Sequence, residues 1–245
     1  MKERRIGLAR ALSKLGYCSR AQAVGLIRSG KVTLNNRVTT NPETPVREAT
    51  DKIAVEGNPV AVAGRIYLML NKPRGIVTTA CDEKGRATVY SLLPPELPWL
   101  APVGRLDKAS EGLLLLTNDS EWAARITAPE SHLDKIYHVQ IGAVADQSLL
   151  DAIGEGVKSR DEVFTVKRAS VLRGGEKNTW LEIVLDEGRN RQIRRIFEGL
   201  DVEVLRLMRV SIGPLELGNL AKGQFRKLTA AEKRALDPAF PRTCY

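Results

Sequence analysis

The feature that most constrains the fold is a run of four leucines at residues 113–116, which is long enough for a strand and too apolar to face water. A polar turn comes just before it and carries one aspartate, Asp107, within the sequence Gly-Arg-Leu-Asp-Lys-Ala-Ser-Glu-Gly of residues 104–112. A carboxylate fixed to a buried strand suits nucleophilic or acid–base chemistry. Taken alone, however, Asp107 fits a solvated turn residue paired with Lys108, and only the rest of the chain favours a functional role.

Length and composition predict one large domain with a small appendage, or two modest domains. The chain has 245 residues, of which 43% are hydrophobic, so it can bury at least one full core. Its three cysteines, Cys18, Cys81 and Cys244, form no CxxC pair and indicate reduced thiols in a cytoplasm. No apolar run approaches the roughly 20 residues that cross a bilayer. The Arg-rich start could imitate a transit peptide, but it continues directly into sequence typical of a folded domain, so a cleaved leader is the weaker interpretation.

Positive charge is concentrated at the N-terminus. The net charge of the chain is +9, and residues 1–37 contribute +8 of it, from nine basic side chains and one acid. A solvated basic face would explain an ordinary cluster, but an excess confined to one short segment indicates a module that contacts phosphates. The basic residues are Lys2, Arg4, Arg5, Arg10, Lys14, Arg20, Arg28, Lys31 and Arg37.

The same segment predicts two helices and a hairpin. Leu8, Leu12 and Leu15 share one helical face, which Gly16 ends. Ser19 begins a second helix with a capping box, and residues 32–38 alternate as two strands about a tight Asn-Asn turn. This order resembles the alpha-L RNA-binding domain, which we place at residues 1–62. The resemblance implies that the helices and hairpin present basic residues to a structured RNA, here Arg10, Lys14, Arg20, Arg28 and Lys31.

A second domain is expected at residues 65–245, after a stretch of small residues at 61–64. Strands are predicted at 67–70, 76–79, 113–116, 135–142, 163–172, 179–185 and 202–209. Helices are predicted after a cap at 118 or 119, and at 146–153, 191–199 and 229–236. Strands outnumber helices without a regular βαβ rhythm, so the fold class is α+β, with a mixed or antiparallel sheet.

The sequence lacks the motifs of several common enzyme chemistries. There is no phosphate-binding loop, no GxGxxG fingerprint and no GxSxG elbow, and the two histidines, His132 and His138, leave no metal triad.

Besides Asp107, a second candidate functional segment is the arginine-rich sequence of residues 187–195, Glu-Gly-Arg-Asn-Arg-Gln-Ile-Arg-Arg. On a helix beginning near Arg191, Ile193 turns toward the core and Arg194 is partly buried, so Arg194 needs a carboxylate partner. Asp107 is the obvious candidate, although an ordinary basic helix facing RNA would explain the other arginines.

Taken together, these stretches resemble the bacterial ribosomal RNA pseudouridine synthases over nearly the whole chain. The resemblance rests on the N-terminal module and on the blocks at residues 71–75, 104–107, 112–118, 135–139 and 187–195. The departures, at residues 108–111 and at Ser120, fall outside the catalytic positions of the family.

The resemblance implies a mechanism and a set of site residues. Asp107 would be the essential aspartate of an isomerase that cleaves the uridine glycosidic bond and rejoins C5 to the ribose. Arg194 would pair with it, and Tyr137 would stack on the uracil. Substrate or RNA contacts are expected from Lys72, Arg105, Arg189, Arg191 and Ile193.

The same resemblance implies the partner and the conditions of the reaction. The target uridine would be flipped out of a ribosomal RNA or precursor ribosomal particle, with a mild preference for the large subunit. We expect a cytoplasmic monomer that needs no metal or organic cofactor and contacts no membrane.

Two other functions remain open. A non-catalytic RNA-binding or ribosome-assembly factor would need only the basic segments, and Asp107→Asn would then leave its function intact. An RNA methyltransferase bearing the same N-terminal module is a weaker alternative, because the chain has no glycine-rich cofactor loop after a strand.

Overall fold

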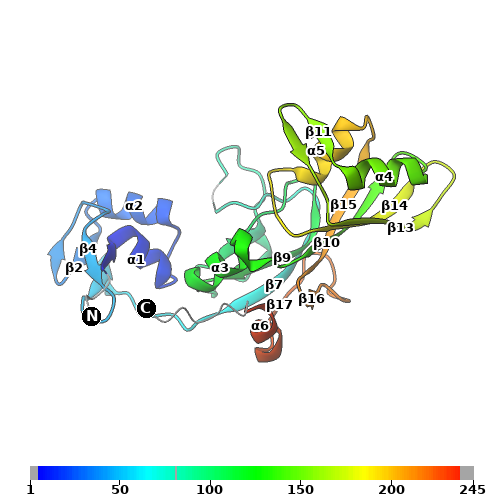
Figure 1. Cartoon of the computed structure of the whole chain (residues 1–245). Coiled ribbons are helices and arrows are strands. Elements are labelled where there is room, and N and C mark those ends of the chain that lie inside the picture. The colour runs from blue at the N-terminus through cyan, green and yellow to red at the C-terminus, as the bar shows by residue number, and fades with distance from the viewer. Residues whose placement is uncertain (1–4, 81, 238–245) are drawn as a thin grey trace.

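The computed structural model describes residues 5–80 and 82–237 and contains two lobes (Figure 1). The N-terminal lobe holds helices α1 (Leu8–Lys14) and α2 (Arg20–Arg28) and short strands around them. The small sheets of this lobe are β1 (Arg5–Gly7) with β4 (Pro45–Arg47), and β2 (Val32–Leu34), β3 (Arg37–Val38), β5 (Ile53–Val55) and β6 (Asn58–Pro59). The predicted boundary near residues 62–65 lies in the segment between the last of these strands and the first strand of the second lobe.

Local signals explain the N-terminal lobe. Ser19 and Gln22 form the predicted capping box, with bonds of 3.2 and 3.0 Å between each side chain and the other's backbone N–H. Asn35 and Asn36 both have positive φ, which is the conformation of the tight hairpin turn expected between β2 and β3. Leu8, Leu12 and Ile27 are fully buried between the helices and the strands.

The second lobe is built on a nine-stranded mixed sheet. Its strands lie in the order β13-β14-β10-β15-β9-β7-β17, with β16 beside β15 and β8 beside β9. All its ladders are antiparallel except that of β15 with β9. The strands are β7 (Tyr67–Lys72), β8 (Ala101–Val103), β9 (Glu111–Thr117), β10 (Lys135–Ile141), β13 (Arg168–Gly174), β14 (Thr179–Leu185), β15 (Val204–Ile212), β16 (Leu215–Glu216) and β17 (Phe225–Lys227). The predicted α+β class is therefore confirmed, including the mixed sheet.

The four leucines are buried because β9 is covered on both faces. Leu113 and Leu115 pack with helix α3 (Ser120–Thr127) and helix α6 (Ala230–Leu236). Leu114 and Leu116 pack on the opposite side, in a cluster that includes Leu106 beside Asp107. Strands covered on both faces read as continuous apolar runs. The turn carrying Asp107 is thus attached to a strand in which every residue is buried.

The remaining elements cover the sheet at its other end (Figure 1). Ile153 of α4 (Gln147–Glu155) and Ile193, Ile196 and Phe197 of α5 (Gln192–Gly199) pack on β10 and β14. A small hairpin, β11 (Val157–Ser159) with β12 (Glu162–Phe164), contacts α5. Two 3-10 helices, η1 (Val89–Leu92) and η2 (Pro129–Ser131), complete the elements.

Two strand predictions are wrong. The predicted strand at 76–79 is irregular, and only Val77 forms an isolated bridge, to Thr88, while β7 pairs with β9 and β17. The predicted single strand at 163–172 is divided, because β12 ends at Phe164 and β13 begins at Arg168. In the first case the partners of β7 come from distant parts of the chain, which alternation alone does not reveal. In the second case β12 and β13 belong to two separate hairpins, with β11 and with β14.

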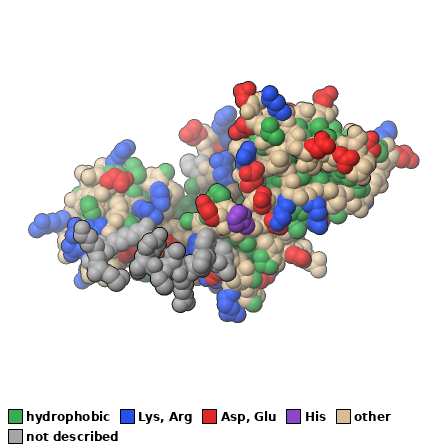
Figure 2. Space-filling view, viewed as in Figure 1, with side chains coloured by type: hydrophobic (Ala, Val, Ile, Leu, Met, Phe, Trp, Pro, Cys, Tyr) green, Lys and Arg blue, Asp and Glu red, His purple; other side chains and the backbone are tan. Residues whose placement is uncertain are grey.

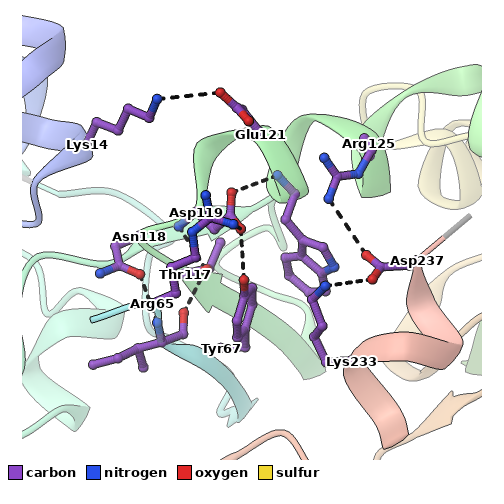
Figure 3. A network of polar contacts seen from close by, with 12 residues as sticks. Lys14, Arg65, Tyr67, Thr117, Asn118, Asp119, Glu121, Arg125, Lys233 and Asp237 are labelled. Carbon is purple, nitrogen blue, oxygen red and sulfur yellow. Dashed lines mark hydrogen bonds and ion pairs between the residues drawn. The ribbon is translucent and has the colours of Figure 1, made fainter. Parts of the chain in front are cut away.

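A polar network ties the segment between the lobes to the sheet and to the C-terminal helix (Figure 3). Asp119 caps α3 by accepting from Trp122 N at 3.1 Å, and it also accepts from the Tyr67 hydroxyl at 2.8 Å and pairs with Arg65 at 2.9 Å. Asn118 accepts from Ile66 N at 2.9 Å. This region contacts the N-terminal lobe through an ion pair of 3.4 Å between Lys14 and Glu121, and through a hydrogen bond of 2.7 Å from Trp99 N to Gly16 O.

Two further predictions concern membranes and cysteines. Among the described residues, no helix is both long and apolar enough to span a bilayer. Cys18 is buried with a free thiol, and burial raises the pKa of this thiol to about 11. Cys81 and Cys244 lie outside the described residues.

Candidate active site

Asp107 lies at the surface of the second lobe on the loop between β8 and β9. Its neighbour Leu106 is buried, and the Asp107 carbonyl accepts from Ser110 N at 3.0 Å, which closes the turn. The Asp107 side chain is 32% exposed. The carboxylate is therefore held in place by a short turn and remains open to a ligand.

Lys72, at the end of β7, supports this loop from inside. It is fully buried, and its Nζ donates to the carbonyl oxygens of Pro73 at 3.2 Å, Asp107 at 3.1 Å and Ser110 at 2.8 Å. Burial lowers the pKa of Lys72 to about 8, and the nearby carboxylates of Asp107 and Glu111 oppose this change. The prediction that Lys72 contacts RNA is therefore wrong, because a side chain without exposed surface cannot reach it. Lys72 positions the Asp107 loop instead.

The arginine that pairs with Asp107 is Arg191. Its Nη1 lies 3.4 Å from Asp107 Oδ2, and Arg191 stands at the N-terminus of α5 with a left-handed backbone, φ 53°. Arg194, the predicted partner, donates from Nη2 to the carbonyl of Ala109 at 3.1 Å instead. The hydrogen-bonded pair predicted between Arg194 and Asp107 is thus not the one observed, because Arg194 points at the backbone of the same loop. Its burial was predicted correctly, and burial lowers the pKa of Arg194.

Gln192 fixes the segment that carries the arginines. Its buried amide donates to Thr165 O at 3.0 Å and to Glu187 Oε1 at 2.8 Å, and its oxygen accepts from Arg189 N at 3.2 Å. Arg189 itself is exposed and donates to Glu187 at 3.2 Å. Gln192 was not among the predicted residues, and its position just before Ile193 is the only sequence signal that could have marked it.

A cavity of about 410 Å³ opens beside Asp107 between these segments. Six of the eight site residues predicted in the second lobe line it, whereas Lys72 and Arg194 do not. Ile193 is 3% exposed and belongs to the core beneath it, and Tyr137 of β10 is only partly buried. The predicted residues that meet here are Arg105, Asp107, Tyr137, Arg189, Arg191 and Ile193.

The floor of the cavity contains a residue that the sequence did not single out. Arg209 of β15 pairs with Tyr137 across the β10–β15 ladder and with Gly112 across the parallel β15–β9 ladder. Gly112 has φ +103°, and a Cβ there would collide with the Arg209 carbonyl and lie 2.9 Å from its N. Only glycine therefore allows β15 to come this close to the strand that follows the Asp107 turn.

The predicted RNA-contacting residues of the N-terminal lobe divide into two groups. Arg10, Arg20 and Arg28 are exposed, and Figure 2 shows Lys and Arg side chains spread over this lobe. Lys14 is bound to Glu48 at 2.7 Å and to Glu121, and Lys31 is bound to Glu56 at 2.7 Å. Lys14 therefore connects the two lobes.

A basic helical module joined to a mixed sheet, with a carboxylate-bearing cavity at the sheet, defines an enzyme with a nucleic-acid-binding appendage. Residues 66–199 match the model of the family described as RNA pseudouridylate synthase, and residues 6–53 match the S4 domain. The chain belongs to the RNA pseudouridylate synthase family, whose members are isomerases that convert uridine in RNA to pseudouridine.

The similarity to individual proteins extends over almost the whole chain. A Bacillus subtilis (strain 168) protein named ribosomal large subunit pseudouridine synthase B is 34% identical over 94% of each chain. An RNA pseudouridine synthase of Aquifex aeolicus (strain VF5) is 36% identical over 93% of this chain and 92% of its own. A crystal structure of a pseudouridylate synthase superposes with a TM-score of 0.65 at 30% identity, covering 94% of this chain and 99% of the other. The predicted family is confirmed.

No group of three or more potential metal ligands occurs among residues 5–80 and 82–237. The cavity instead combines the carboxylates of Asp107, Asp186 and Glu187, a tyrosine ring and several guanidinium groups. These groups suit recognition of an anionic polymer with a planar base, through ion pairs, stacking and hydrogen bonds.

Proposed function

We propose that this protein isomerises one uridine of large-subunit ribosomal RNA, with Asp107 as the essential residue. The large subunit as target is supported by the Bacillus subtilis relative, whose name states it. The observation that carries the catalytic assignment is the position of Asp107, whose partly exposed carboxylate lines the 410 Å³ cavity while its loop is held by buried Lys72.

Asp107 acts on the anomeric carbon. When the N1–C1′ bond of uridine breaks, positive charge develops at C1′, and a nearby carboxylate stabilises it or forms an adduct with it. The ion pair with Arg191 orients the carboxylate, and Arg194 holds the following turn through Ala109. Both arginines therefore serve Asp107, one directly and one through the backbone.

Tyr137 receives the base. Its ring lies on β10 at the wall of the cavity, where a flat uracil can stack on it. A uridine within a folded RNA must leave its stack to reach this position, which costs a few kcal/mol. Arg105, exposed beside Asp107, then contacts the flipped nucleotide, as does the side of Ile193 that faces the cavity.

Phosphate contacts supply the energy for flipping. Arg189 and Arg191 lie at the cavity, and Arg10, Arg20, Arg28 and Lys31 extend the basic surface over the N-terminal domain, residues 1–62. Such binding weakens steeply with salt.

The catalytic domain, residues 65–245, acts as a monomer in the cytoplasm on ribosomal RNA or a precursor ribosomal particle. It needs no cofactor, because isomerisation requires neither a redox change nor a group donor.

Tritium release from RNA labelled at uridine C5 tests this function. Each subunit RNA is incubated separately with the wild type and with Asp107→Asn, and RNA affinity is measured in parallel. We expect the wild type to release tritium from large-subunit RNA alone, and the variant to bind that RNA equally well without releasing any. Equal release by the variant would refute the role of Asp107. Salt-sensitive binding without release from RNA or precursor particles would favour a non-catalytic binding factor.

A further inference from the structure

Arg209 is a buried cation without a counter-ion. It is 6% exposed and lines the cavity beside Asp107. Its Nε donates to Leu113 O at 2.8 Å, whereas its Nη2 is buried and has no hydrogen-bond partner. Within the described part of the chain, no carboxylate lies within ion-pair distance of it. A buried guanidinium with an unpaired N–H group and no counter-ion destabilises the fold, unless a bound molecule accepts a hydrogen bond from it.

A second arginine on the same strand provides a comparison, because its guanidinium is paired with a carboxylate of the protein. Arg206 lies on β15 three residues earlier and donates to Glu111 from Nε at 3.0 Å and from Nη2 at 2.7 Å. Its guanidinium also lies 5.4 Å from the centre of the Trp180 ring. The two N–H groups of Arg206 that face Glu111 are therefore paired within the protein, whereas Arg209, which lines the cavity, has a buried Nη2 without a partner.

The neighbours of Arg209 indicate what approaches it. Tyr137 is its direct partner across the β10–β15 ladder, and Lys135 lies two residues from Tyr137 on β10. Lys135 also lines the cavity, and burial together with the positive charge of Arg209 lowers its pKa. A base stacked on Tyr137 would therefore lie close to two cations at the cavity floor.

The chemistry of the reaction needs positive charge at this position. Breaking the N1–C1′ bond leaves the electron pair on uracil, where it spreads over N1, O2 and O4. The base then turns, C5 bonds to C1′, the C5 proton passes to a base, and N1 gains a proton, so the product is an isomer of the substrate. The anionic uracil is the species that a fixed guanidinium stabilises most. Its carbonyl oxygens also match guanidinium donors, whereas the amino group of cytosine would not.

We propose that Arg209 is a further catalytic residue of this enzyme, which hydrogen bonds a carbonyl oxygen of the flipped uracil and stabilises the negative charge that the base acquires. This inference rests on the proposed function. It assigns Arg209 to the base and Asp107 to the sugar, so the two charges that develop when the bond breaks each meet an opposite charge of the protein.

Single-turnover tritium release tests the role of Arg209. The variants are Arg209→Met, Arg209→Lys and the matched control Arg206→Met, each measured with the C5-labelled RNA that the wild type uses. Binding of that RNA and thermal unfolding are followed for all of them. Removal of one donor to a developing anion lowers kcat by about 10²–10³-fold. We expect that loss in Arg209→Met with RNA affinity within threefold of wild type, partial recovery in Arg209→Lys, and a smaller loss in Arg206→Met.

Each other outcome overturns the proposal. Activity of Arg209→Met within threefold of wild type would exclude a catalytic role, and equal losses in Arg209→Met and Arg206→Met would show a structural one. If Arg209→Met does not fold, Arg209→Lys decides, since the proposal requires its rate to fall at least tenfold with unchanged RNA affinity. Failure of the wild type to release tritium from any RNA would refute the proposed function itself, which the variants do not test.

Discussion

Replacing Lys72 with methionine removes the ammonium group that holds the Asp107 loop and keeps most of the side-chain volume. Three carbonyl oxygens, of Pro73, Asp107 and Ser110, then lose the hydrogen bond from Lys72, and the Asp107 oxygen keeps only the one from Ser110 N. A hydrogen bond to a charged group contributes about 1.5–3 kcal/mol, so the gross loss is about 5–9 kcal/mol. Removing a buried charge offsets part of this loss.

The size of that offset follows from the pKa of Lys72. Its decrease from 10.5 to about 8 corresponds to about 3 kcal/mol. We therefore expect Lys72→Met to lower the free energy of unfolding by about 2–6 kcal/mol. Displacement of the Asp107 carboxylate by about 1 Å would lower kcat by about 10²-fold as well.

Urea unfolding and single-turnover tritium release measure the two effects. Lys108→Met is the matched control, because Lys108 is exposed on the same loop and its loss removes a charge without these hydrogen bonds. The control should unfold within about 0.5 kcal/mol of wild type. A Lys72→Met protein as stable and as active as Lys108→Met would refute the idea that Lys72 positions the loop.

Three further expectations concern stability. Gly112 has φ +103°, and a Cβ there would meet the backbone of Arg209, so Gly112→Ala should lower the free energy of unfolding by at least about 2 kcal/mol. The control Gly174→Ala meets open space and should change that free energy little, and urea unfolding of both variants checks this. Asp119→Ala removes the cap of α3 and the acceptor of Tyr67, so denaturation should show a loss of about 2–4 kcal/mol, against about 1 kcal/mol for the exposed cap variant Asp146→Ala. The pKa of Lys72 is lower in the folded than in the unfolded chain, so the unfolded state binds more protons between pH about 8 and about 10.5. The free energy of unfolding of wild type, relative to that of Lys72→Met, should therefore rise with pH in that window. A constant difference between the two proteins from pH 7 to 10 would contradict this.

The N-terminal lobe was predictable because its signals are local. The capping box of Ser19 and Gln22 and the Asn35–Asn36 turn each act over two to four residues, and the structure has both. The same holds for α3 and α6, whose caps Asp119 and Thr229 lie beside the helices they begin.

The arrangement around Asp107 was less predictable, because its contacts connect distant residues. Lys72 reaches a loop 35 residues later, and its hydrophilic side chain gives no sign of burial in the sequence. Arg209 reaches the cavity through the parallel pairing of β15 with β9, which no turn or spacing specifies. The partner of Asp107 is Arg191 rather than the predicted Arg194, because Arg191 is the N-cap of α5 with a left-handed backbone, φ 53°, so helical periodicity does not describe the direction of its side chain.

The strand predicted at residues 76–79 illustrates the same limit. Its alternation is compatible with a hairpin to β7, yet β7 is already paired on both sides, by β9 and by β17. The β17 strand has only three residues, Phe225–Lys227, and carries no pattern strong enough to identify it.

Nucleoside analysis of the RNA recovered from enzyme complexes shows whether Asp107 is essential for converting uridine to pseudouridine in large-subunit ribosomal RNA. Large-subunit ribosomal RNA is bound to equal saturation by wild type and by Asp107→Asn, incubated, digested to nucleosides and separated by chromatography. We expect one uridine per RNA to be replaced by pseudouridine with the wild type and none with the variant, at unchanged RNA affinity. Pseudouridine formed at the wild-type rate by Asp107→Asn would contradict this expectation.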